Sequence, residues 1–149
     1  MFNENMKAKG RLKIVLKDEN GAVKDTREVD NLVVNTGLAY IASRMKDATA
    51  TAMTHMGLGS GSTAAAAGDT DLGSLLGSRE ALDSTTVTSN AIEYVASFEA
   101  GDATGAVTEA GIFNASTGGT MLCRTVFSVV NKGANDTMTV TWTITISAA

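Results

Sequence analysis

The segment TMTVTWTITI (137–146) alternates strictly between threonine and a larger apolar residue. Because successive side chains of a strand point to opposite faces, Val140, Trp142 and Ile144 fall on one face and the threonines on the other. This pattern is typical of a strand that packs its apolar face into a core and turns its hydroxyl face to water or to a partner. It is the strongest constraint on the fold.

Four further segments are predicted to be strands, because clusters of turn residues bound them. They are 79–90, 91–100, 106–115 and 120–130. Strands of about ten residues with this punctuation predict an all-β fold, an antiparallel β-sandwich of jelly-roll or Ig-like type, as a single domain over 1–149. The expected core comprises Trp142, Val140, Ile144, Phe98, Phe113 and Phe127.

One short amphipathic helix is expected at NTGLAYIASRMK (35–46). Asn35 or Thr36 would cap its N-terminus through a side-chain oxygen, and basic residues suit its C-terminal end. Apolar residues recur there at helical spacing, so the helix should lie on a sheet or close one end of a barrel. The stripe consists of Leu38, Ile41, Ala42 and Met45.

The beginning of the chain predicts a hairpin, with strands at 11–17 and 22–29 around the turn DENG. Residues 1–30 could form an N-terminal arm that contacts a neighbour. The longest concentration of basic residues falls on one strand face and comprises Lys7, Lys9, Arg11, Lys13 and Lys17. The net charge of −4 and pI near 4.9 favour a solvated face, so no nucleic-acid partner is expected.

The stretch MGLGSGSTAAAAGD (56–69) has the glycines of a phosphate-binding loop but not its context. No Lys-Ser or Lys-Thr pair follows, and further glycines interrupt any helix that could face a phosphate. We expect instead a long flexible loop over 57–78 that reaches a neighbouring subunit. Its candidate contact residues are Gly59, Ser60, Gly61, Asp69 and Asp71.

Few residues suit catalysis or metal binding. His55 and Cys123 are the single histidine and the single cysteine, too few for a zinc site, and nothing places them together. Asp69 and Asp71 lack calcium-loop spacing and are expected to stabilise turns. We therefore expect no cofactor, no metal and no enzymatic activity. Because no apolar run suits a signal peptide or a membrane span, we expect a protein made in the cytoplasm.

Two charged residues stand inside apolar strands, Glu109 in VTEAGIF and Arg124 in MLCRTVF. If these strands are neighbours, the two side chains can form a partly buried ion pair. Such a pair fixes strand register more than it adds stability.

Several segments together resemble small structural proteins of tailed bacteriophages, found among head-decoration, cement and tail-fibre-associated proteins. The resemblance covers about 30–147 and is most specific in VTEAGIFN, GGTMLCRTVF and the threonine-alternating strand. It implies a β-rich virion component without catalytic residues, located in the virion after synthesis in the host bacterium. Implied partners are the major capsid protein or another virion protein, and further copies as a dimer or trimer.

The leading hypothesis is a protein that decorates or cements a capsid. The alternative is a subunit of a tail fibre, collar or baseplate, which would act as an adaptor or receptor-binding tip. A carbohydrate-binding sandwich is disfavoured, because sugar sites use exposed aromatic rings. Tyr40, Tyr94 and Trp142 are all expected to face the core.

Overall fold

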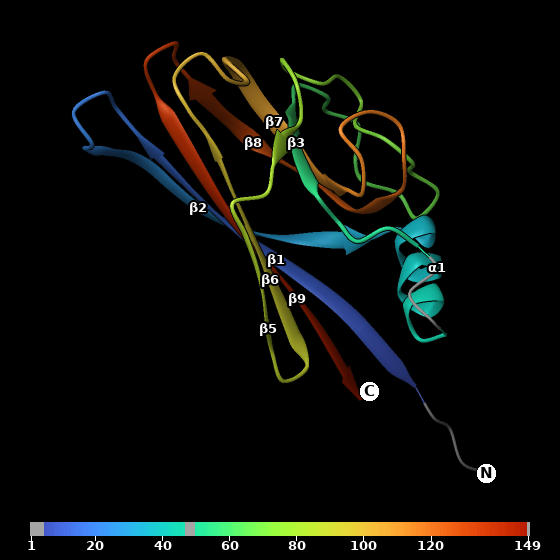
Figure 1. Ribbon diagram of the computed structural model, residues 1–149. Helices are drawn as coiled ribbons and strands as arrows, with labels where there is room; N and C mark the ends of the chain where they lie inside the picture. Colours follow the sequence, from blue (N-terminus) through green and yellow to red (C-terminus); the bar gives the residue numbers. More distant parts are fainter. Residues whose placement is uncertain (1–4, 47–49, 149) are drawn as a thin grey trace.

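The computed structural model describes residues 5–46 and 50–148, which form nine strands and one helix. All strand pairs are antiparallel, and the strands follow the order β4-β3-β7-β8-β2-β1-β9-β6-β5 in one sheet (Figure 1). The predicted all-β antiparallel class with one short helix is therefore confirmed. The elements are β1 (Met6–Lys17), β2 (Val23–Val33), α1 (Asn35–Arg44), β3 (His55–Gly59), β4 (Glu80–Ala81), β5 (Ser84–Thr88), β6 (Ala91–Phe98), β7 (Gly105–Phe113), β8 (Met121–Lys132) and β9 (Thr137–Ala148).

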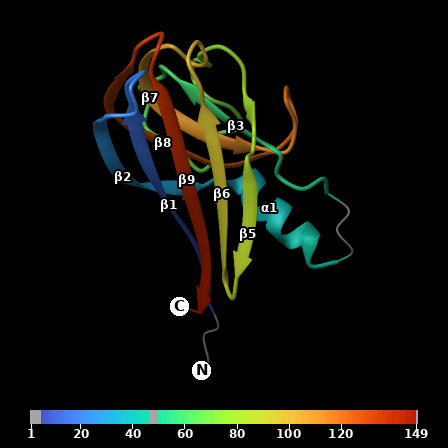
Figure 2. The same ribbon diagram turned by 60° about the vertical axis from the view of Figure 1, so that its left-hand side comes forward.

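Strand β2 joins the two halves of the sheet. It pairs with β1 up to the pair Gly10 and Asn31, and its last residues, Leu32 and Val33, pair instead with β8. The sheet curls at this point, so that β5-β6-β9-β1 faces β8-β7-β3-β4 (Figures 1 and 2). The curled sheet encloses the main core, as expected for a fold whose strands each have one apolar face.

The core draws side chains from both halves of the sheet. Five of the expected residues are buried, and Phe127 is partly buried against the same cluster. Phe113 belongs to a second, smaller cluster with Val34 and Met121. The buried residues of the expected set are Trp142, Val140, Ile144, Phe98 and Phe113.

The expected N-terminal hairpin is present as β1 and β2, but β1 is not an arm. It pairs with β9 along its whole length, from Met6 with Ala148 to Lys17 with Thr137. It is thus an interior strand of the sheet. The first residues of the expected arm, 1–4, lie outside the described residues.

Helix α1 lies against β8 and differs in detail from the sequence prediction. Its N-cap is Val34, without a side-chain hydrogen bond, and the Thr36 hydroxyl donates instead to the Met121 carbonyl at 2.9 Å. Leu38 and Met45 are exposed rather than part of a buried stripe. Ile41 of the expected stripe and the adjacent Tyr40 contact the core, because the helix lies across one end of the curled sheet. In the described part of the chain, no helix has the length and apolar character that a membrane crossing requires.

Candidate functional site

The glycine-rich segment forms a loop that is folded back on the sheet. Residues 57–59, which we expected within the loop, belong to β3. Beyond them the chain turns back, so that the Ser60 amide donates to the Ser74 carbonyl at 2.8 Å and the Leu76 amide to the Leu58 carbonyl at 2.9 Å. The segment 60–78, called here the anchored loop, therefore starts and ends beside the same strand.

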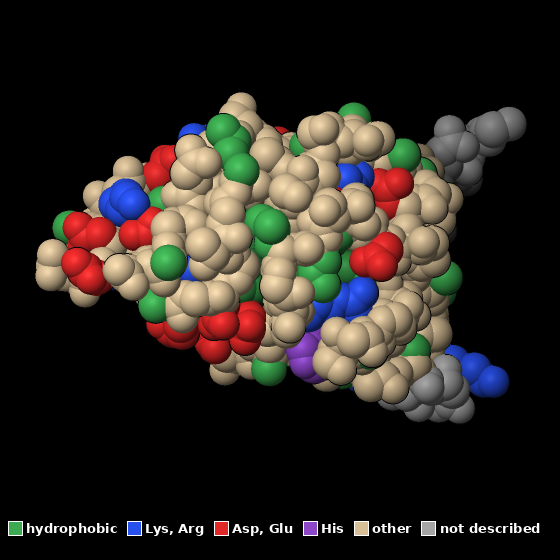
Figure 3. All heavy atoms as spheres, turned by 90° about the horizontal axis from the view of Figure 1, so that it is seen from above, with side chains coloured by type: hydrophobic (Ala, Val, Ile, Leu, Met, Phe, Trp, Pro, Cys, Tyr) green, Lys and Arg blue, Asp and Glu red, His purple; other side chains and the backbone are tan. Residues whose placement is uncertain are grey.

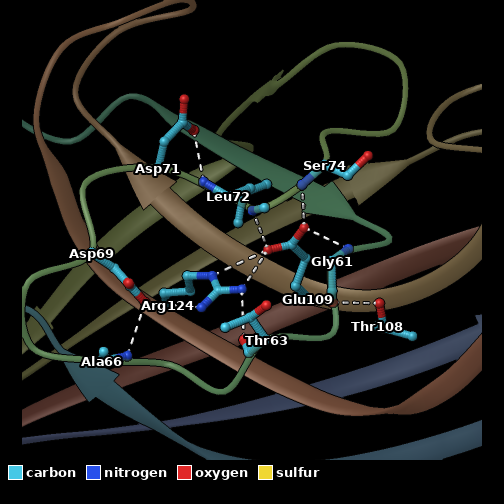
Figure 4. A network of polar contacts seen from close by, with 11 residues as sticks. Gly61, Thr63, Ala66, Asp69, Asp71, Leu72, Ser74, Thr108, Glu109 and Arg124 are labelled. Carbon is cyan, nitrogen blue, oxygen red and sulfur yellow. Dashed lines mark hydrogen bonds and ion pairs between the residues drawn. The ribbon is translucent and has the colours of Figure 1, made fainter.

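Glu109 of β7 holds the anchored loop from beneath (Figure 4). Its side chain is fully buried, and it accepts hydrogen bonds from the backbone N–H groups of Gly61, Gly73 and Ser74, each at 2.7 Å. One carboxylate thus joins both branches of the loop. Thr108, its neighbour on β7, adds a hydroxyl bond to the Gly61 carbonyl at 2.7 Å.

Arg124 of β8 completes the network, and the ion pair expected with Glu109 is present. Its Nε and Nη2 donate to Glu109 Oε1 at 3.1 and 3.0 Å. Nη1 donates to Asp69 Oδ2 at 2.8 Å, and Nη2 also donates to the Thr63 carbonyl at 3.0 Å. The guanidinium is only 3% exposed, so this cation has exchanged water for fixed oxygen partners.

Both carboxylates of the network are held in the ionised form. Burial raises the pKa of Glu109, but the N–H groups of Gly73, Ser74 and Gly61, with Arg124, outweigh it and bring the pKa below the ordinary value. The pKa of Asp69 is lowered by the Ala66 N–H, and Arg124 lowers it further against the effect of burial. The network therefore carries charge at neutral pH.

Arg79 fixes the far end of the anchored loop. Its guanidinium stacks over the Phe113 ring, with 3.4 Å from Cζ to the ring centroid, and donates to the carbonyls of Ala115 and Gly118 at 2.9 and 2.8 Å. A longer contact of 3.4 Å reaches Asp71 Oδ1. A stacked, multiply bonded arginine of this kind adds rigidity that a lysine could not supply.

A glycine is required at position 61 by the close approach of Glu109. A Cβ at Gly61 would overlap the Glu109 carboxylate. At Gly68, by contrast, a Cβ would meet open space. The glycine that resembled part of a phosphate cradle thus makes room for a carboxylate of the protein itself.

The predicted contact residues divide into two groups. Gly59 is buried in β3 and Asp69 is occupied with Arg124, so neither presents a free group to a partner. Ser60 and Asp71 are exposed, and Gly61 is half-buried. Asp69 and Asp71 also accept bonds from the Ala66 and Leu72 amides, which is the turn chemistry expected of them.

The other candidates for catalysis, His55 and Cys123, form none of the hydrogen bonds of this network. His55 lies on β3 with its Nδ1 2.8 Å from the Thr54 hydroxyl. Cys123 is fully buried, and burial raises the pKa of its thiol well above the ordinary value. A thiol of this kind is unreactive at neutral pH. Among the described residues, no cluster of three or more His, Cys, Asp or Glu side chains has the arrangement of a metal site.

Sequence analysis found the ion pair but missed the loop that it holds. The donors from Gly61, Gly73 and Ser74 are backbone groups, which leave no side-chain pattern to recognise. Arg79 and Thr63 also went unnoticed. The available signal was an acidic residue in an apolar strand together with a loop of small residues, since a buried carboxylate needs donors and small residues let backbone N–H groups approach.

Comparison with protein families, curated proteins and solved structures found no match. The chemistry of the site is therefore read from its own contacts. Glu109, Arg124 and Asp69 are directed inward and hold the anchored loop in place, whereas Asp71, Leu75 and several small side chains are exposed on its outer surface.

Proposed function

We propose that the protein is a non-enzymatic structural component of a tailed-bacteriophage virion, which decorates or cements the capsid through protein–protein contacts. The resemblance in VTEAGIFN, GGTMLCRTVF and TMTVTWTITI suggests this class of protein. The partner would be the major capsid protein or another virion protein.

The observation that carries the proposal is the anchoring of the loop by Glu109 and Arg124. A surface segment fixed before contact loses little conformational entropy when a partner binds, so it supports docking by shape. Seen from above, the visible face is covered mainly by backbone and uncharged polar side chains, with the charged side chains in separate groups (Figure 3). Such a surface suits close contact with the surface of another protein.

The chemistry of the network also argues for a structural role. A general acid or base needs a carboxylate that can reach a substrate proton. Glu109 Oε1 already accepts bonds from the Gly73 N–H and from Arg124, Oε2 accepts bonds from backbone N–H groups, and the side chain is fully buried. The network therefore supports the position of the loop rather than proton transfer.

The test is to delete the coding sequence from the phage genome that carries it and examine the particles. Decoration predicts capsids that assemble but lose heat stability, and that regain it on adding the purified protein in numbers that match the capsid lattice. A few copies per particle at the tail would identify the fibre, collar or baseplate alternative. Particles unchanged by the deletion would overturn both.

A matched pair of variants locates the contact. Ala64 is exposed on the anchored loop, and Asn135 is exposed in the turn between β8 and β9. Ala64→Arg should weaken rebinding to the deleted particles, because a long charged side chain breaks the fit of a small-residue surface. Asn135→Arg adds the same side chain elsewhere and should rebind as the wild type does. Equal binding by both variants would exclude the anchored loop as the contact.

A further inference from the structure

Strand β1 has an unpaired edge at its N-terminal end. It pairs with β9 from Met6 onward, but its pairing with β2 begins only at Gly10, because β2 turns away toward β8 at Leu32. Among the described residues, Met6–Lys9 has no strand partner on this side. Alternate backbone N–H and C=O groups of such an edge point outward and are free to bind another strand.

A groove of about 1110 Å³ runs along this edge. It lies between β1, the end of β2, α1 and the threonine side of β9, and charged residues of β1 and β2 line it together with three exposed apolar side chains. Met6 is 66% exposed, Leu38 48% and Leu32 37%. A strand edge bordered by exposed apolar residues is the usual form of a β-augmentation site.

An unpartnered amide borders the same groove. Asn31 contributes to the lining, and both its Oδ1 and its Nδ2 are buried without a hydrogen-bond partner in the described structure. The amide lies over Gly10, where any Cβ would overlap it. A buried amide without a hydrogen-bond partner is destabilising. A second molecule that bonds this amide, directly or through a trapped water, therefore gains binding free energy.

Strand β5, which ends the nine-stranded sheet beyond β6, is also unprotected. Among the described residues its sequence STTVT pairs with β6 alone, and all five residues are exposed. It has none of the lysines, prolines or inward charges that usually prevent edge pairing. Val87, the fourth of its five residues, is 69% exposed.

We propose that β5 of one copy adds to the free edge of β1 in the next copy, and that repetition of this contact closes a ring. The two edges match in length, with five residues in β5 and four in Met6–Lys9. They also match in direction. The antiparallel order β1-β9-β6-β5 makes β5 run opposite to β1, so a rotation about an axis along the strands places them antiparallel.

The faces and charges of the two edges are compatible. Thr85 and Val87 lie on the side of β5 that borders a groove with Tyr94 and Ile144, which is the apolar face of the sheet. In a continued sheet this face meets the apolar side of β1, where Ala8 packs on the core. β5 brings no charge toward Lys7 and Lys9. A contact between two different surfaces is heterologous, and such contacts form rings when the rotation closes.

Self-pairing of β5 with β5 would be the simpler arrangement, but it leaves the groove with Met6, Leu32 and Leu38 uncovered. The heterologous contact covers both open edges at once. It concerns assembly alone and holds whether or not the protein belongs to a virion.

The test measures the mass of the purified full chain by analytical ultracentrifugation. Val87→Lys places a charged side chain on β5 and should prevent it from pairing with another copy. Leu38→Lys places a charged side chain in the groove and should prevent β5 from entering it. Each should raise the dissociation constant by about 30-fold or more, the loss expected from a central contact. Val23→Lys, at a residue 58% exposed and outside both surfaces, is the matched control and should assemble as the wild type does.

Mixing the two variants provides the decisive result. Each keeps one intact surface, so Val87→Lys and Leu38→Lys should be monomeric alone and form a one-to-one heterodimer together. If either lysine variant loses its β-sheet circular dichroism spectrum, the milder pair Val87→Thr and Leu38→Ala should show the same complementation with smaller effects.

A wild-type protein that stays monomeric at high micromolar concentration would overturn the proposal. Assembly of Leu38→Lys without its partner would do so as well, because it indicates β5 self-pairing. Failure here with particle binding intact would leave the proposed function standing.

Discussion

The anchored loop and the N-terminal end of β1 differ in whether their buried polar groups have hydrogen-bond partners in the described structure. At the anchored loop, Glu109 accepts five hydrogen bonds, three from backbone N–H groups and two from Arg124. At the open end of β1, the Asn31 amide has no partner in the described structure, and the Met6–Lys9 edge is unpaired. The anchored loop thus has its hydrogen-bond partners within the chain, whereas our assembly proposal gives those of the β1 edge to a second copy. The first should therefore control stability and the second assembly.

Loss of the Glu109 carboxylate should have the largest effect on stability. Glu109→Ala leaves Arg124 buried without its main counter-charge and removes the acceptor of three backbone N–H groups. We expect a loss of about 3–5 kcal/mol in the free energy of unfolding, as for other broken buried pairs. Denaturation in urea monitored by circular dichroism measures it.

Two comparisons sharpen this result. Glu28 pairs with Arg11 in the open, both side chains being more than half exposed, so Glu28→Ala should cost less than about 1 kcal/mol. Replacing Glu109 and Arg124 together by apolar residues should cost less than Glu109→Ala alone, since no unpaired cation remains. Equal losses for the single and double variants would show that the pair is not coupled.

A Cβ at Gly61 should have the next largest effect. Gly61→Ala would press on the Glu109 carboxylate, and overpacking of this kind costs about 1–3 kcal/mol. Gly68→Ala, in the same loop but facing open space, is the matched control and should be close to neutral. Thermal unfolding of the two variants side by side separates a steric effect from a general change in loop entropy.

Acid should weaken the anchored end selectively. The folded pKa of Glu109 lies below its ordinary value of 4.5, so its stabilising contribution is complete above that value and disappears as the pH falls through the folded pKa. The pKa of Asp69 is also lowered in the folded state, so its contribution to stability is lost at low pH as well. The free energy of unfolding should decline below about pH 4.5 in the wild type. The decline should be shallower in Glu109→Gln, which has no titrating group there. Parallel pH profiles for the two proteins would place the acid sensitivity elsewhere.

The parts of the fold that follow local periodicity were predictable. The alternation in 137–146 predicted β9 and its core face, and the turn clusters delimited β7 and β8. The position of β1 between β2 and β9 was not predictable, because pairing over such sequence distances leaves no local pattern. Nor was the exposure of Leu38, since helical spacing identifies an apolar stripe but not which part of it the sheet covers.

Only those parts of the site that consist of charged side chains in apolar strands were predictable from the sequence. Glu109 and Arg124 stood out as charges in apolar strands, and their pairing followed once β7 and β8 were neighbours. The backbone donors of the loop and the unpartnered Asn31 amide depend on tertiary geometry. An asparagine at a strand end has the appearance of an ordinary turn residue in the sequence.

The smallest expected effect on the isolated fold is at the open end. Val87→Thr keeps the β-branched shape at an exposed position and should change the free energy of unfolding of the monomer by less than about 0.5 kcal/mol. Its effect should appear in the concentration dependence of Tm instead, because an oligomer that forms only from folded chains raises Tm as the protein concentration increases. Wild-type Tm should therefore rise with concentration, and Val87→Thr should weaken that rise while matching the wild type at high dilution. Glu109→Ala should instead lower Tm at every protein concentration and leave the dependence of Tm on concentration unchanged.

If Val87→Thr instead lowered Tm equally at all concentrations, β5 would contribute to the stability of the monomer. The contrast between the anchored loop and the open edge would then not hold.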